Sequence, residues 1–150
     1  MSLLLSAVVG LHLLFAGLWT GSVLFFTYSL LPLARGGELA VATLDAATGK
    51  LTMVSRVSAG LQLLTGAYLA SPMAFGTSGY WSSTDGMIVI AMVVLWFLLA
   101  AFTEQAASKI HDGLDADSVR SNAATATTWL YLASVVAVLL LLDAGLLAGL

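Results

Sequence analysis

Charged residues are scarce in this chain and are confined to a few short segments. Only five Lys or Arg and eight Asp or Glu occur among 150 residues, and 60% of the sequence is hydrophobic. A helix needs about 20 consecutive apolar residues to cross the roughly 30 Å hydrocarbon core of a bilayer. Four stretches reach that length, at about residues 3–33, 51–75, 87–107 and 125–150. The sequence therefore predicts an integral membrane protein.

The four stretches predict an all-α fold, an antiparallel four-helix bundle that forms one domain over residues 1–150. In a bilayer every backbone group needs an internal partner, and a helix provides these partners within each segment. Membrane strands alternate polar and apolar residues, whereas residues 135–142 are continuously apolar. The first stretch exceeds the roughly 7–15 apolar residues of a signal peptide, so we expect it to remain as a span. Pro32 and Gly36-Gly37 are expected to end it.

The basic residues predict the orientation in the membrane. Three lie in or beside the first connection and two flank the third, namely Arg35, Lys50, Arg56, Lys109 and Arg120. The second connection and both tails contain no Lys or Arg. Because basic residues concentrate in cytoplasmic loops, we expect a multi-pass plasma-membrane protein with both termini outside, N-out and C-out.

The expected partners follow from the same composition. The lipid bilayer is the first partner, and the sequence contains no basic patch of the kind that binds nucleic acid. Two small-xxx-small patterns, at residues 17–21 and 145–149, permit close helix approach. We expect contacts within the bundle, with a homo-oligomer or another membrane protein as the alternative.

Polar residues inside the apolar stretches are the candidate functional residues, because polar groups are costly at membrane depth. Counted inward from the outer helix ends, four of them lie at similar depths of about 10–15 Å, namely His12, Gln62, Trp96 and Asp143. We expect His12 to face the interior within reach of a polar group from the second or fourth helix. It is then either a metal or haem ligand oriented by Asp143 or Gln62, or a neutral histidine that only links helices.

Arg56 lies on the cytoplasmic side of the second stretch, and Glu104 occupies the corresponding part of the third. The simplest interpretation is a structural ion pair between these two residues. The alternative is that Arg56 binds an anion or a porphyrin propionate, since its planar guanidinium group binds carboxylates through two hydrogen bonds.

Methionines gather at the outer ends of the predicted helices. Met1, Met73 and Met87 lie at these ends, and Met92 lies about a turn deeper. Thioethers favour Cu(I), so Met73, Met87, Met92 and His12 are candidate ligands of a copper site. Methionine is also a common filler of helical cores. The absence of cysteine excludes thiolate metal sites and disulfides.

Residues 11–21, LHLLFAGLWTG, resemble the first helix of the copper resistance D (CopD)-like membrane domain, in which a histidine precedes a Trp-x-Gly motif by a couple of turns. Residues 55–58, SRVS, and the pair Thr65-Gly66 resemble its second helix. The resemblance implies copper handling in the membrane, with His12 and Arg56 at the matching positions. More distantly, the chain resembles the haem-b-binding membrane protoporphyrinogen oxidases of bacteria, which implies haem b as the alternative cofactor.

Three functions follow as alternatives. The chain could handle or transport Cu(I) received at the outer methionines, ligate haem iron through His12 as a membrane redox protein, or serve as an accessory subunit of a membrane complex. An enzyme is the less favoured class, because the sequence shows no nucleophile triad, phosphate-binding loop or pair of catalytic carboxylates.

The predicted orientation can be tested with a single cysteine, since the chain has none of its own. The variant Ser82→Cys places a thiol in the second connection, which we expect to lie outside the cell. A membrane-impermeant maleimide added to intact cells should therefore label it. Labelling from the cytoplasmic side alone would reverse the orientation.

Overall fold

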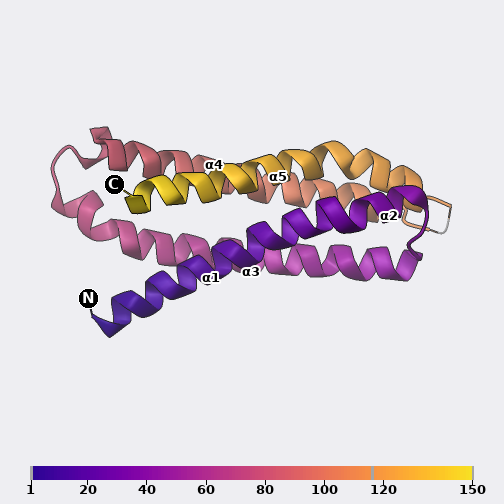
Figure 1. Ribbon diagram of the computed structural model, residues 1–150, viewed down its shortest axis with the longest axis horizontal. Helices are drawn as coiled ribbons and strands as arrows, with labels where there is room; N and C mark the ends of the chain where they lie inside the picture. Colours follow the sequence, from indigo (N-terminus) through magenta and orange to yellow (C-terminus); the bar gives the residue numbers. More distant parts are fainter. Residues whose placement is uncertain (1, 116, 150) are drawn as a thin grey trace.

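The computed structural model describes residues 2–115 and 117–149, without the side chains of residues 73 and 74. Throughout this part of the chain every regular element is helical, and no strand occurs. Four long helices run antiparallel (Figure 1). The two termini and the connection over residues 77–83 lie at one end, termed here the terminal end, and the other two connections lie at the opposite loop end (Figure 1). The predicted all-α, four-helix architecture is confirmed.

The first long helix is continuous over residues 3–36 but changes its winding before Pro32. It comprises α1 (Leu3–Phe25), the π-helical segment η1 (Phe26–Leu30) and α2 (Leu31–Gly36). Proline has no N–H to donate, and its ring clashes with the carbonyl four residues earlier, which belongs to Tyr28. A π-helical turn, in which the Leu31 amide donates to the Phe26 carbonyl, widens the helix there. The prediction that Pro32 helps to end this helix was wrong.

Gly37 ends the helix instead. Its φ of 75° lies in the left-handed region, which glycine adopts without steric cost. The amides of Gly37 and Glu38 donate to the carbonyls of Ala34 and Leu33 at 3.0 and 2.9 Å, which is the hydrogen-bond pattern of a Schellman cap. The predicted stop at residues 36–37 is therefore confirmed.

The second long helix, α3 (Val41–Gly76), begins well before the predicted start at residue 51. Leu44, Thr48 and Leu51 are buried, and their spacing places them on one face of the helix. The polar segment before the apolar stretch is thus an amphipathic extension of the same helix.

Pro72 lies inside α3 near the terminal end. A proline at this position cannot donate to the carbonyl of Tyr68. The Ser71 hydroxyl donates to that carbonyl at 2.9 Å, so the acceptor is satisfied and the helix continues to its end.

The remaining long helices are α4 (Thr84–His111) and α5 (Val119–Gly149), joined to α3 and to each other by short connections. The connection before α4 contains a short 3₁₀ turn, η2 (Tyr80–Ser82). α4 extends past both ends of the predicted span over 87–107, and α5 begins before the predicted start at 125. Residue 150, the last of that span, lies outside the described residues.

Among the residues that the structure describes, three helices are long and apolar enough to cross a membrane: the continuous helix over Leu3–Gly36, α4 and α5. α3 covers the predicted second span but is not among them. Its second half carries Gln62, Thr65, Ser71 and Pro72, which lower its hydropathy. Length and apolarity are therefore confirmed for three of the four predicted spans, and the fourth is confirmed as a helix.

The tightly packed core lies toward the loop end. In the described part of the chain, α1 has no buried residue before Trp19, α4 has none between Gly86 and Leu99, and α5 has none after Ala137. Figure 1 shows the first half of α1 diverging from the other helices toward the N-terminus. The bundle is therefore tightly packed at its loop end, termed here the closed half, and less tightly packed at its terminal end, termed the open half, where Tyr80 and Gly86 are buried.

The small-xxx-small patterns do not serve contacts within the bundle. A Cβ atom at Gly17, Gly21, Gly145 or Gly149 would have no neighbouring atom within 4 Å among the described residues. These glycines lie on open helix faces, and the expectation of helix contacts inside the bundle was wrong.

Gly86 allows the first turn of α4 to lie directly against the preceding connection. A Cβ atom there would collide with the backbone of Tyr80 and Trp81, which cannot swing away as the end of a side chain can. We expect Gly86→Ala to lower the free energy of unfolding by about 1–3 kcal/mol.

Gly60→Ala is the matched control, because this position in α3 is exposed and has nothing within 4 Å of its Cβ. Alanine there should raise helix stability by about 0.5–1 kcal/mol. Denaturant titration of both variants in one detergent gives the comparison. Equal stability would contradict a close approach at Gly86.

Candidate functional site

The His12 side chain, on α1, contacts α3. The imidazole is half-buried, and its Nδ1 atom lies 2.7 Å from the Thr65 hydroxyl oxygen. That oxygen also lies 2.6 Å from the Leu61 carbonyl. A hydroxyl has one hydrogen to donate. When the carbonyl accepts it, the threonine oxygen accepts from the Nδ1–H group and the neutral ring keeps its lone pair on Nε2; when the hydroxyl donates to Nδ1, the ring proton lies on Nε2.

The expectation for His12 is confirmed in one respect and corrected in another. The imidazole contacts a polar group from the second long helix, as predicted. That group belongs to Thr65, however, and not to Asp143 or Gln62. The side-chain amide of Gln62 donates instead to the backbone carbonyl of His12 at 2.5 Å. α3 therefore holds both the side chain and the main chain of His12.

Gly66 permits this close approach of the imidazole to α3. A Cβ atom at position 66 would lie 3.3 Å from Cε1 of His12, which is closer than ordinary van der Waals contact. Gln62, Thr65 and Gly66 follow one another at i, i+3 and i+4, so they share one face of the helix. Sequence reasoning missed the role of Thr65, although this spacing beside a predicted polar residue could have revealed it.

The second ring nitrogen of His12, Nε2, has no hydrogen-bond partner in the described part of the chain. Metal-binding histidines commonly have this arrangement, in which one ring nitrogen donates to an oxygen and the other coordinates the metal. Along α1, His12 precedes the first buried residue, Trp19. The oriented imidazole therefore lies in the open half of the bundle, next to the start of the closed core.

Trp96 and Asp143 do not join His12 in a hydrogen-bonded layer. The Trp96 ring packs edge-to-face against Trp19, with centroids 6.4 Å apart and an interplanar angle of 83°. Asp143 is half-buried on α5 and forms no hydrogen bond with His12 or Gln62 among the described residues. Of the four polar residues predicted at similar depth, the structure brings His12 and Gln62 together.

Four polar atoms are buried without a hydrogen-bond partner in the part of the chain that the structure describes. They are Nε1 of Trp19, Oγ of Ser58, Nε1 of Trp96 and Oδ2 of Asp143, and each comes from a different long helix. A buried polar group without a partner costs about 1–3 kcal/mol, so native proteins usually supply one from a ligand or water. These four atoms are therefore positions at which water or a ligand could supply a partner.

Arg56 forms the predicted ion pair with Glu104. Its Nε and Nη2 atoms each donate to a different carboxylate oxygen at 2.8 Å, and both side chains lie on the surface of the bundle. This two-bond contact uses one full edge of the guanidinium group. The geometry favours the structural interpretation of Arg56 over a cofactor clamp.

The candidate methionine ligands are distributed along the open half of the bundle. Met87 is exposed in the first turn of α4, and Met92 is half-buried further along the same helix. Met1 and the side chain of Met73 lie outside the described residues. Within the described ranges, no group of three or more His, Cys, Asp or Glu residues could hold a metal ion.

Comparisons of this chain with known proteins found no match. No family model, curated protein or solved structure matches the chain.

The orientation of His12 by Thr65 can be tested with a change that preserves side-chain shape. Thr65→Val removes the acceptor of the Nδ1–H group, so we expect the ¹⁵N resonances of His12 to shift toward a mixture of tautomers. The unfolding free energy should fall by about 0.5–2 kcal/mol. Thr65→Ser retains the hydroxyl and serves as the control. Identical imidazole resonances in all three proteins would contradict the hydrogen bond.

Proposed function

We propose that this chain is a multi-pass plasma-membrane protein with both termini outside the cell. Three long apolar helices support insertion. The distribution of basic residues supports the orientation, because Arg35, Lys109 and Arg120 lie near the loop end and Lys50 and Arg56 lie in the half of α3 that starts there. Under the positive-inside rule the loop end faces the cytoplasm.

We further propose that the protein handles Cu(I), with Nε2 of His12 as the primary ligand. The single observation that carries this proposal is the orientation of the imidazole, whose Nδ1 lies 2.7 Å from the Thr65 hydroxyl oxygen while Nε2 has no partner among the described residues. In the proposed tautomer Nδ1 donates to Thr65 and Nε2 keeps its lone pair. Imidazole and thioether are ligands that Cu(I) favours. Met92, half-buried on α4, is the candidate second ligand. The resemblance of residues 11–21 to the CopD-like family points to the same chemistry.

The loosely packed terminal end is the proposed route for the ion. The helices have no fully buried described residue in the first half of α1 or after Ala137 of α5. Met87, exposed near this end, is placed to receive an ion from outside, and His12 lies deeper along α1. The closed core that begins at Trp19 would hold the ion at this depth until the helices rearrange.

Haem b is the alternative ligand of the same nitrogen, since one imidazole suffices for a five-coordinate iron. A porphyrin, however, must separate the helices that hold it, whereas a single ion needs no such space. The imidazole packs closely on Gly66, and the pockets beside Arg35 and Lys50 lie in the loop-end half. These contacts favour the ion.

An accessory subunit is the second candidate function. The observation that favours it is the outward exposure of Gly17 and Gly21, which leaves a smooth strip on α1. Helices approach each other closely in membranes through such strips.

Copper and haem binding can be tested on the purified protein by titration with Cu(I) and with haemin. We expect His12→Ala to weaken Cu(I) binding by more than about tenfold and Thr65→Val to weaken it by about tenfold, because the threonine orients the ligand. His111→Ala is the matched control. That histidine lies in the last turn of α4, where its Nδ1 is 3.0 Å from an Asp45 carboxylate oxygen.

The outcomes separate the candidate functions. Equal Cu(I) affinity of wild type and His12→Ala would remove His12 from the site. A Soret band in the wild type that is lost in His12→Ala would replace copper with haem. Binding of neither ligand would favour the accessory subunit.

A further inference from the structure

We propose that the pocket between α2 and α5 binds the phosphate group of an anionic phospholipid from the cytoplasmic leaflet. This inference rests on the proposed membrane insertion and orientation, and it adds a lipid site that copper handling does not require. Charge, geometry and depth each support it.

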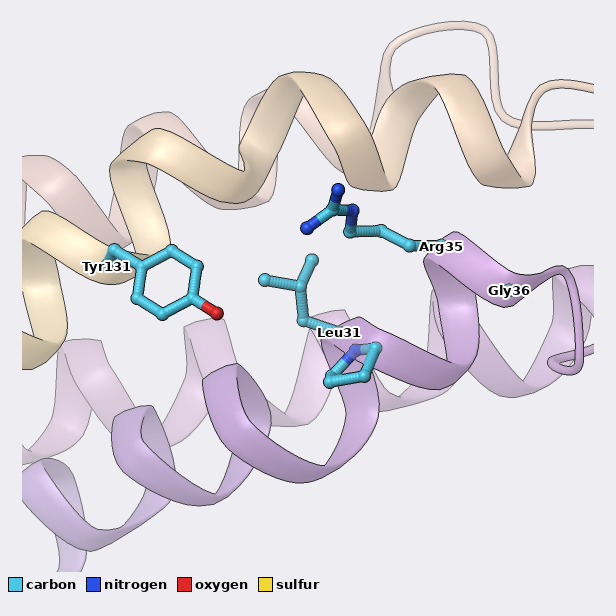
Figure 2. A pocket seen from close by; sticks show the side chains of 5 residues that line it. Leu31, Arg35, Gly36 and Tyr131 are labelled. Carbon is cyan, nitrogen blue, oxygen red and sulfur yellow. The ribbon is translucent and has the colours of Figure 1, made fainter.

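The pocket has a volume of about 420 Å³ and is lined by Leu31, Pro32, Arg35, Gly36 and Tyr131. Figure 2 shows the Arg35 guanidinium group and the Tyr131 hydroxyl directed toward the space between the two helices. Pro32 supplies an exposed apolar side chain beside these groups, whereas Leu31 is buried. The pocket thus combines two polar donors with one exposed apolar side chain.

Both donors are available for a ligand. Across the described residues, neither the Arg35 guanidinium group nor the Tyr131 hydroxyl forms a hydrogen bond or ion pair. Arg56, by contrast, has a full edge of its guanidinium group engaged by Glu104. A phosphate accepts hydrogen bonds from a planar guanidinium group through two parallel contacts, and a phenol can add a third.

The charge of the pocket lining favours an anion, because Arg35 is the charged residue among those that line it. Beside the lining, the guanidinium group of Arg120 packs against Gly37 and the carboxylate of Glu38 lies close to Gly36. These two flanking charges are opposite in sign, so the attraction for an anion comes from Arg35.

The depth of the pocket favours a lipid over a free anion. Tyr131 packs edge-to-face against Tyr28, with centroids 5.9 Å apart, and both rings are exposed. Exposed tyrosines are typical of the headgroup region. Arg35 lies about 10 Å beyond Tyr28 along the helix, toward the loop end, where an anionic inner leaflet attracts basic residues.

Lipid retention by the full-length protein tests this site. The protein is reconstituted into nanodiscs that contain equal amounts of phosphatidylglycerol and phosphatidylcholine, and retained lipids are counted by native mass spectrometry. We expect wild type to retain phosphatidylglycerol preferentially. The ratio of retained phosphatidylglycerol to retained phosphatidylcholine should fall about fivefold in Arg35→Gln and about twofold in Tyr131→Phe. Lys109→Gln removes the same charge from the same end, outside the pocket, and should behave as wild type.

Three results would overturn the lipid site. The first is equal retention of both lipids by wild type, and the second is equal loss in Arg35→Gln and Lys109→Gln. The third is displacement of the lipid by millimolar inorganic phosphate, which would identify a free-anion site instead. Arg35→Gln should still bind Cu(I) as wild type does, so these results leave the copper proposal intact. A wild type that fails to enter nanodiscs would overturn both proposals.

Discussion

The contact between α3 and His12 fixes the position of α1 in the open half of the bundle. Before Trp19, the described part of α1 has no buried side chain to fix its position. Thr65 and Gln62 instead bind the side chain and the main chain of His12. The position of the helix and the orientation of the candidate ligand therefore depend on the same two hydrogen bonds.

The buried hydroxyl groups show which interior polar residues serve structure alone. Four threonines donate to the carbonyl four residues earlier in their own helix, at 2.7–2.8 Å, namely Thr20, Thr27, Thr48 and Thr103. Such bonds satisfy a hydroxyl without any partner from outside the helix. Thr27 also accepts from Ser134 at 2.9 Å and so links the first helix to α5. Against this background, the unpartnered atoms of Trp19, Ser58, Trp96 and Asp143 stand apart as groups suited to a guest.

The apolar stretches predict the existence and order of the helices, because burial of apolar residues in a helix determines both. They do not predict where the helices end. Leu44 and Thr48 extend α3 through packing that hydropathy does not detect, and the π-helical turn carries the first helix past Pro32.

The candidate site was predicted in part for a related physical reason. Depth along a helix can be counted from the sequence, so the pairing of Arg56 with Glu104 and the proximity of His12 and Gln62 were predictable. Rotation about the helix axis depends on packing. For that reason Thr65, rather than Asp143, is the partner of the imidazole.

The tight packing of one half of the bundle and the looser packing of the other indicate that the two halves lie in different surroundings. α3 contains 36 residues and is about 54 Å long, whereas a bilayer core is roughly 30 Å thick. In a membrane the loop end would therefore lie among the lipid headgroups and in the water beyond them, where the hydrophobic effect drives tight burial of Leu44 and Ile110. The terminal end would lie in lipid, where apolar side chains gain little from leaving their surroundings. The same chain would thus pack its loop-end half as a soluble protein does and its terminal half as a membrane protein does.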